Sequence, residues 1–363
     1  MTMINVDEGN GVHFKFDPMA QAIYMTDADG KLVKMDLSPA NVHVESIMRN
    51  FAQKYSNGEM AADKAFPVLT VAKASDKYWT LDPINAFGSV DGSGNVAGGG
   101  VEEISLELSN NTYTSVPYAL GAFIPSEVQA NADVPLNVQI ETLEAVLNRA
   151  MVRRELRCKA KLFTTASWGA SNYIDLTGVP NSKWNGGSAS DPVGVLKTGA
   201  RACLEMPTHM LMSRETWDYF VTNAAVQKYP AFKSSIDPIP MTASAEQWCA
   251  LLDLPKPIIV NSKYRASSSS FPYIWQNDVV LLRMTGNVGT YSHDTCKTFR
   301  WLAAGQEAGN QALAGTYDNG IFVRSFFNPY RGTYGGQQII VGFNDAEVIT
   351  SPLNGYYIKG AVQ

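Results

Sequence analysis

The sequence predicts an α+β fold made of two or three structural regions. Three observations carry this prediction: a glycine-rich β-ribbon in the first third of the chain, a long amphipathic helix after it, and strands near the C-terminal end. With 363 residues, the chain can bury most of its apolar surface and needs no disulfide or metal ion to fold.

The composition limits the function classes. Charged residues make up only 17% of the chain and hydrophobic residues 45%, which indicates that partners cover much of the surface. The net charge of −5 argues against a protein that reads DNA bases, because such proteins carry a basic balance. No apolar run is long enough to cross a bilayer, and Met1–Glu8 does not resemble a signal peptide. We therefore expect no membrane partner.

The four cysteines, Cys158, Cys203, Cys249 and Cys296, lie far apart with no paired spacing. This argues against a zinc ribbon or a disulfide scaffold and suits a reducing cytoplasm. We expect free cysteines that act as small hydrophobic core residues.

The N-terminal region, residues 1–65, is predicted to be an arm followed by a helix. Residues 1–37 are polar and contain turn signals. Ser38 and Pro39 then begin a helix that runs to about Lys54, because serine caps helices and proline is favoured at their first position.

Residues 66–118 are predicted to form an extended loop built as a two-stranded ribbon, which follows an apolar strand at 66–71. Gly92-Ser93-Gly94 and Gly98-Gly99-Gly100 mark its tip, and Ile104 and Leu106 alternate with polar residues on the return strand. Isolated hairpins are marginal in water, so this ribbon needs cover from elsewhere.

Between Tyr78 and Pro117 every charged residue is acidic; these are Asp82, Asp91, Glu102, Glu103 and Glu107. The ribbon also carries the aromatic residues Tyr78, Trp79, Phe87 and Tyr113, with Tyr118 just after it. Such residues suit a sugar-binding surface, a base-stacking surface or a protein contact. Because no basic residue accompanies them, we favour contact with another subunit over nucleic acid.

A long helix is predicted from Pro135 to Phe163, roughly 40 Å in length, within a region spanning 119–189. Acids near its start and bases in its second half complement the helix dipole. Arg154 falls on the apolar side. Either its stem lies along the core with the charge at an edge, or it meets an acid there.

Residues 190–345 form a mixed α/β region with helices capped by Asp191, Ser213 and Ser244, and with strands near 257–260, 274–284 and 321–327. Residues 337–362 are predicted to form strands separated by turns at Asn344-Asp345 and Asn354-Gly355.

No catalytic constellation is convincing, so we predict neither an enzyme nor a cofactor. The motif beginning at Gly92 leads into a strand, whereas a dinucleotide site must open a helix. Two groups of residues could ligate a metal but lack the spacing of known sites: Cys203, Glu205 and His209, and His293, Asp294 and Cys296. A hydrolase that uses His209 or His293 remains a minor alternative.

The order of these elements resembles the Hong Kong 97-type major capsid proteins of tailed double-stranded-DNA phages. Stretches similar to that family are 66–71 with 75–79, 131–136, 154–155 with 163–165 and Trp168, 190–192, and 354–358. The resemblance covers nearly the whole chain from about residue 38. It implies an N-terminal arm (1–65), an extended loop (66–118), a peripheral domain with a spine helix (119–189), an axial domain (190–345) and a C-terminal return to the peripheral domain (346–363).

The resemblance also implies a function. We expect a protein that self-assembles, as hexamers and pentamers, into an icosahedral shell around double-stranded DNA, without sequence-specific contact with it. Scaffolding, portal and cement proteins are possible partners, and the short arm suits a separate scaffolding protein. Such a protein is made and assembled in the host cytoplasm and ends in the virion. Alternatives are an encapsulin-type nanocompartment shell and a sugar-binding, tail-associated structural protein.

In that family an extended loop lies over a neighbouring subunit. We therefore expect the ribbon acids to face Arg149, Arg153 and Arg157 of a neighbour, because residues four apart share one flank of a helix. The alternative is that these arginines are solvated or pair with acids of their own chain.

Some relatives lock their shells with a covalent lysine–asparagine link that uses a lysine in the extended loop. Since no lysine lies between Tyr78 and Pro117, we predict that no such link forms from this loop. Particles boiled in denaturant should run as single monomers on a gel, and a ladder of covalent oligomers would contradict this.

Overall fold

The computed structural model describes residues 60–81, 108–131, 138–186, 189–228, 244–267, 269–286, 293–301 and 321–362, together with four short strands before residue 36. The helix expected at Ser38–Lys54, the start of the central helix at Pro135 and the ribbon tip with its five acids and Phe87 lie outside the described residues.

The first four strands form an antiparallel sheet in chain order. They are β1 (Ile4–Asp7), β2 (His13–Asp17), β3 (Ala22–Thr26) and β4 (Leu32–Met35). The sequence predicted only a polar arm here. Strands of four or five residues are too short to show a clear alternation against the background of turn residues.

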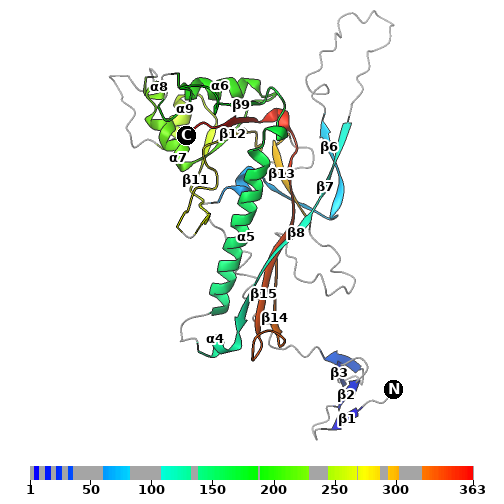
Figure 1. Cartoon of the computed structure of the whole chain (residues 1–363). Coiled ribbons are helices and arrows are strands. Elements are labelled where there is room, and N and C mark those ends of the chain that lie inside the picture. Colours follow the sequence, from blue (N-terminus) through cyan, green and yellow to red (C-terminus); the bar gives the residue numbers. More distant parts are fainter. Residues whose placement is uncertain are drawn as a thin grey trace, which may run out of the picture.

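A second sheet, which we call the spine sheet, carries the long helix α5 (Val138–Leu162). Its order is β14 (Ile321–Asn328), β15 (Gly336–Ile349), β13 (Cys296–Trp301) and β5 (Val68–Val71). Strand β8 (Val116–Pro125) also pairs with β15, on the side of β15 that faces away from β14. Figure 1 shows α5 beside the long strands β8, β14 and β15.

Strand β15 runs unbroken through Asn344 and Asp345, so the turn predicted there is wrong. Both residues sit in the ladder with β8, and Asp345 also pairs with Arg300 of β13. Pairing on both sides of β15 outweighs the local preference of Asn-Asp for a turn.

The base of the predicted ribbon is confirmed. β6 (Ser75–Leu81) pairs antiparallel with β7 (Leu108–Thr114), from Ser75 opposite Thr114 to Leu81 opposite Leu108. The base is anchored on its own chain, because Tyr78 and Tyr113 pack against Phe299 of β13 with ring centroids 5.2 and 4.5 Å away.

A third sheet has the order β11 (Lys256–Val260), β10 (His209–Ser213), β12 (Val279–Leu282), β16 (Tyr356–Lys359) and β9 (Tyr173–Asp175). Near it lie α6 (Pro192–Ala202), α7 (Arg214–Thr222), α8 (Ala224–Gln227) and α9 (Ala245–Leu251) (Figure 1). The caps predicted for α6, α7 and α9 are confirmed, including the Ser244–Gln247 capping box. The expected strand at 274–284 is shorter, and Ile274 and Trp275 are buried outside it.

The sheets divide the chain differently from the ranges that the sequence predicted. Strands β13 and β14 and most of β15, expected in the axial region 190–345, belong to the spine sheet. Strand β16, expected to return to the peripheral domain, lies between β12 and β9 in the third sheet. Strand β9, from the range 119–189, pairs with β16 there. Sheet membership depends on pairing between distant segments, which local patterns do not specify.

Short helices complete the described fold: α2 (Ala62–Ala65), α4 (Ser126–Ala130) and the 3-10 turns η1 (Thr165–Ser167) and η5 (Pro352–Asn354). The four cysteines are free and buried, as predicted. Burial raises the pKa of Cys203 and that of Cys249 to about 12, so both stay protonated at neutral pH. Within the described chain no helix is long and apolar enough to span a membrane.

Candidate interaction surface

Helix α5 positions the residues that the sequence singled out. Its inner face packs on the spine sheet through a cluster that includes Leu143, Val146 and Leu147 from the helix and Ile339 and Val341 from β15. Its last turns enter a second cluster between the two larger sheets, with Cys158 and Leu162 fully buried. The helix is therefore fixed along its length, and its side chains have defined directions.

Arg154 is buried and meets acids, which confirms the second of the two alternatives for this residue. Its guanidinium pairs with Asp63, and its Nε lies 3.3 Å from Asp345 Oδ2. Arg300 binds the same Asp345 carboxylate with two hydrogen bonds of 2.6 and 2.8 Å. Two arginines and two carboxylates thus join α5 to β13, β15 and the segment that begins α2.

Glu155, the next residue, is fully buried and was not predicted as important. Its Oε1 accepts hydrogen bonds from the backbone N–H groups of Ala61 and Ala62, and its Oε2 accepts one of 2.6 Å from the indole of Trp275. Three donors on one carboxylate fasten the segment before β5 to the middle of α5. The family resemblance at 154–155 includes Glu155, but the local sequence does not show that its carboxylate is buried, because it stands between Arg154 and Leu156 like any helix glutamate.

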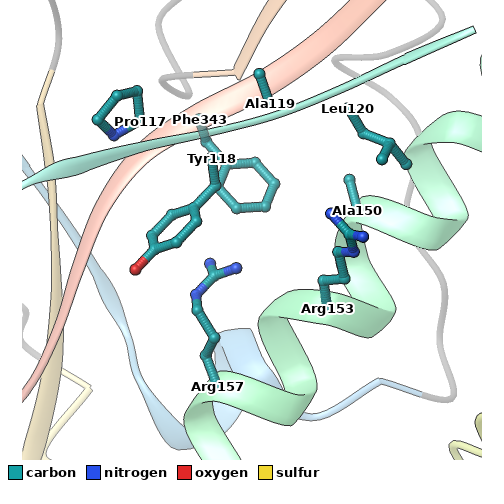
Figure 2. A pocket seen from close by; sticks show the side chains of 8 residues that line it. All are labelled: Pro117, Tyr118, Ala119, Leu120, Ala150, Arg153, Arg157 and Phe343. Carbon is teal, nitrogen blue, oxygen red and sulfur yellow. The ribbon is translucent and has the colours of Figure 1, made fainter.

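Arg157 contacts two residues of its own chain. It donates two hydrogen bonds, of 3.1 and 2.7 Å, to Glu347 of β15. Its guanidinium also lies 3.5 Å from the ring centroid of Tyr118, an arrangement typical of cation–π contacts. Figure 2 shows the two side chains facing each other. In the structure Arg157 therefore pairs with an acid of its own chain, which is the alternative given for these arginines.

Arg149 and Arg153 differ from Arg157 because both are exposed. Among the described residues neither forms an ion pair. They border two hollows between α5 and β8, one of about 150 Å³ that includes Arg153 and one of about 410 Å³ that includes Arg149. We call these two hollows together the spine groove. Figure 2 shows Arg153 and Arg157 along its helix side, opposite Tyr118 and Leu120 of β8.

Of the aromatic residues expected at a subunit contact, the structure buries Tyr78 and Tyr113, which are only 5% and 6% exposed. The expectation that these two lie on an exposed surface is wrong, since Phe299 packs against both. A pattern of alternating residues shows which side chains share a face of a ribbon, and it does not show which part of the body that face meets. Trp79 lies in β6.

The two groups weighed as metal ligands hold no such site in the described residues. Glu205 pairs instead with Arg283, and its Oε1 accepts a hydrogen bond of 2.7 Å from His293 Nδ1. His209 Nδ1 lies 2.8 Å from the hydroxyl of Thr208, and burial lowers its pKa. These residues connect neighbouring loops through hydrogen bonds.

Comparison with known proteins agrees with this geometry. The chain is 23% identical over 327 residues to a major capsid protein of Pseudomonas phage JBD67, which covers 90% of this chain and 99% of that protein. The structure of this chain is similar to that of a phage-related protein from Bordetella bronchiseptica RB50, with a TM-score of 0.61 and 18% identity over 87% of this chain and 97% of that one. A putative prophage capsid protein from E. coli CFT073 gives a TM-score of 0.48 at 14% identity, over 87% of this chain and 98% of that one.

No protein-family model matches the chain. The assignment of the fold rests on two observations. The elements occur in the order of a ribbon, a long helix and two mixed sheets, and the similarity extends along nearly the whole length of the relatives. The chain has the Hong Kong 97-type capsid fold.

Proposed function

We propose that this chain is the major capsid protein of a tailed double-stranded-DNA phage, a structural protein whose copies assemble into an icosahedral shell. The observation that carries the proposal is the similarity to a phage major capsid protein over 90% of this chain and 99% of that protein, joined to the fold described above. The same observation favours a phage shell over an encapsulin-type compartment or a tail-associated sugar-binding protein.

The shape of the subunit suits this function. The base of the ribbon projects from the body beyond β13, and the long strands and α5 extend in another direction (Figure 1). Exposed apolar side chains lie on the turn that joins β14 to β15, where Tyr330 is 97% and Tyr334 71% exposed. An elongated subunit of this kind offers many separate contact surfaces, and closed symmetry can convert many weak contacts into a stable shell.

The expected assembly consists of hexamers and pentamers of this one chain, located in the virion after assembly in the host cytoplasm. Scaffolding, portal and cement proteins are expected as further partners. A net charge of −5 suits a wall that holds DNA without binding it tightly, because basic contacts would bind phosphate strongly. Assembly requires no cofactor, since burial of apolar and charged surface supplies the free energy.

Size-exclusion chromatography and electron microscopy of the purified wild-type protein test the proposal. We expect megadalton, closed particles, and we expect particles purified from infected cells to contain double-stranded DNA. A protein that stays a 39.6 kDa monomer or a small ring under all assembly conditions would refute a shell function. Particles that enclose a cargo protein in place of DNA would establish the encapsulin alternative.

A further inference from the structure

The sheet formed by β1 to β4 has two faces of different composition. Residues directly opposite each other in neighbouring strands share a face, and so do residues two apart within a strand. The register therefore assigns eight residues to one face, and all eight are apolar: Ile4, Val6, Phe14, Phe16, Ile23, Met25, Val33 and Met35. We call these eight positions the N-terminal apolar face.

The opposite face holds every charged residue of the four strands. These residues are Asp7, Lys15, Asp17 and Lys34. A sheet with one apolar and one polar face buries the apolar face against another layer and leaves the polar face in water. The N-terminal apolar face thus requires a covering layer.

The rest of the described chain does not supply this layer. Among the described elements, β1 to β4 make extensive contacts only with one another. Figure 1 shows them apart from α5 and from the two larger sheets. An apolar surface of this kind that its own subunit does not cover marks a site of interaction with a partner.

The width of the face distinguishes a helix from a second sheet as the partner. Four strands about 4.8 Å apart span roughly 15–20 Å, whereas a helix is about 10 Å across. The helix that the sequence predicts at 38–54 would therefore cover only about half of the face. A second sheet of the same width would cover all of it.

A second copy of the same sheet has the required size and chemistry. The N-terminal apolar face carries no charge, so two copies of it do not repel each other, and two-fold symmetry presents the same surface on both partners. Eight apolar residues that each lose roughly 60 Å² of exposed area bury on the order of 1,000 Å² over the two partners, the size of a small specific interface. Residues 36–59 connect β4 to the described body and can span up to about 80 Å, so the sheets of two subunits can meet.

We propose that the N-terminal sheets of two copies of this chain stack through their apolar faces and form a two-fold β-sandwich. Sheets packed in this way lie about 10 Å apart, and the charged faces are on the outside. In a shell, the sandwich joins two subunits at a contact separate from the ribbon and the spine groove. The inference goes beyond the proposed function, because it concerns a pair of chains and does not require a closed shell.

A single spin-labelled cysteine in the full-length protein tests the sandwich. Lys15→Cys places a thiol on the charged face, and the four native cysteines are buried, so the label reacts with the new thiol. In the sandwich the labels of two copies lie on opposite outer faces of two stacked sheets. We expect double electron–electron resonance to give a narrow distance peak at roughly 20–35 Å.

Three substitutions in the labelled chain show which face makes the contact. Phe14→Asp puts a charge into the N-terminal apolar face and should reduce the amplitude of the peak at least about fivefold, because burying an unpaired charge is costly. Phe14→Leu keeps the face apolar and should retain the peak. Tyr24→Asp is the matched control, since it adds the same charge on the opposite face, where its register partner is Lys34, and it should also retain the peak.

Three results would overturn the sandwich. One is a Lys15→Cys chain that shows no peak below about 40 Å, and another is a peak that survives Phe14→Asp. The third is a peak that Tyr24→Asp removes equally, because the distance then reports the order of the sheet and not a contact through its apolar face.

The sandwich and the shell function fail separately in this experiment. The distance is measured in purified particles and, where the protein forms none, in the soluble protein. Particles without the peak refute the sandwich alone, and soluble protein that shows the peak but forms no particles refutes the shell function alone. Soluble protein with neither refutes both.

Discussion

Replacing Glu155 with alanine should lower the free energy of unfolding of the subunit by about 3–5 kcal/mol, because a buried carboxylate and its donors are lost together. The carboxylate accepts hydrogen bonds from Ala61, Ala62 and Trp275. Without it, three buried donors have no acceptor. Urea unfolding of the unassembled subunit, followed by tryptophan fluorescence, measures the change.

Glu144→Ala is the matched control, since Glu144 is an exposed glutamate on the same helix. We expect its stability to stay within about 0.5 kcal/mol of the wild type. A loss below about 1 kcal/mol for Glu155→Ala would mean that water or a shifted backbone satisfies the three donors, and that Glu155 does not fasten the segment before β5 to the helix.

The pH dependence of Glu155→Gln adds a second measurement. Burial raises the pKa of Glu155, so the folded subunit holds a proton on this group more tightly than the unfolded chain does. The stability that Glu155 contributes is therefore largest at acid pH and falls as pH rises above its unfolded pKa of about 4.3. Glutamine does not titrate. The free energy of unfolding of Glu155→Gln should therefore fall further below that of the wild type at pH 4 than at pH 7.

Replacing Ile358 with aspartate should prevent the subunit from folding, because it places an unpaired charge at a fully buried position of an interior strand of the third sheet. Ile358 is fully buried in β16, opposite Val279 of β12 and Ile174 of β9. We expect a loss above about 4 kcal/mol, close to the whole stability of a typical domain. The soluble fraction after expression and the yield of particles report the effect.

Two controls distinguish the effect of a buried charge on stability from the effect of any substitution in β16. Ile358→Val removes one methylene group and should cost about 0.5–1.5 kcal/mol. Lys359→Gln removes a half-exposed ion pair with Asp175, 2.7 Å long, and should leave the midpoint of urea unfolding nearly unchanged, because exposed ion pairs contribute little. Soluble, assembling Ile358→Asp protein would show that β16 is not needed between β12 and β9.

The helices and the general fold could be predicted from the sequence because their signals are local. The caps at Asp191, Ser213 and Ser244 lie within three residues of the backbone groups that they bind. The apolar stripe of α5 repeats along the helix, so it needs no knowledge of what it packs against. The ribbon could be predicted for the same reason, since alternation and glycine clusters are properties of neighbouring residues.

The partners of individual charges could not be predicted in the same way. Arg153 and Arg157 lie one helical turn apart and are chemically identical, yet Arg157 binds Glu347 and stacks on Tyr118, whereas Arg153 is exposed. The difference arises from β8 and β15, which are distant in sequence. The buried positions of Tyr78 and Tyr113 have the same origin, since Phe299 lies far along the chain.

The sequence by itself determined the class of fold, the long helix, the capped helices, the free cysteines and the acidic character of the ribbon between Tyr78 and Pro117. Only the tertiary structure decided which strands share a sheet, that Asp345 is a buried partner of Arg154 and Arg300, and that Arg149 and Arg153 border an open groove. Local patterns are set by hydrogen bonds and side-chain contacts within a few residues. Sheet order and charge pairing depend on contacts between residues far apart in the chain, so the complete fold is needed to define them.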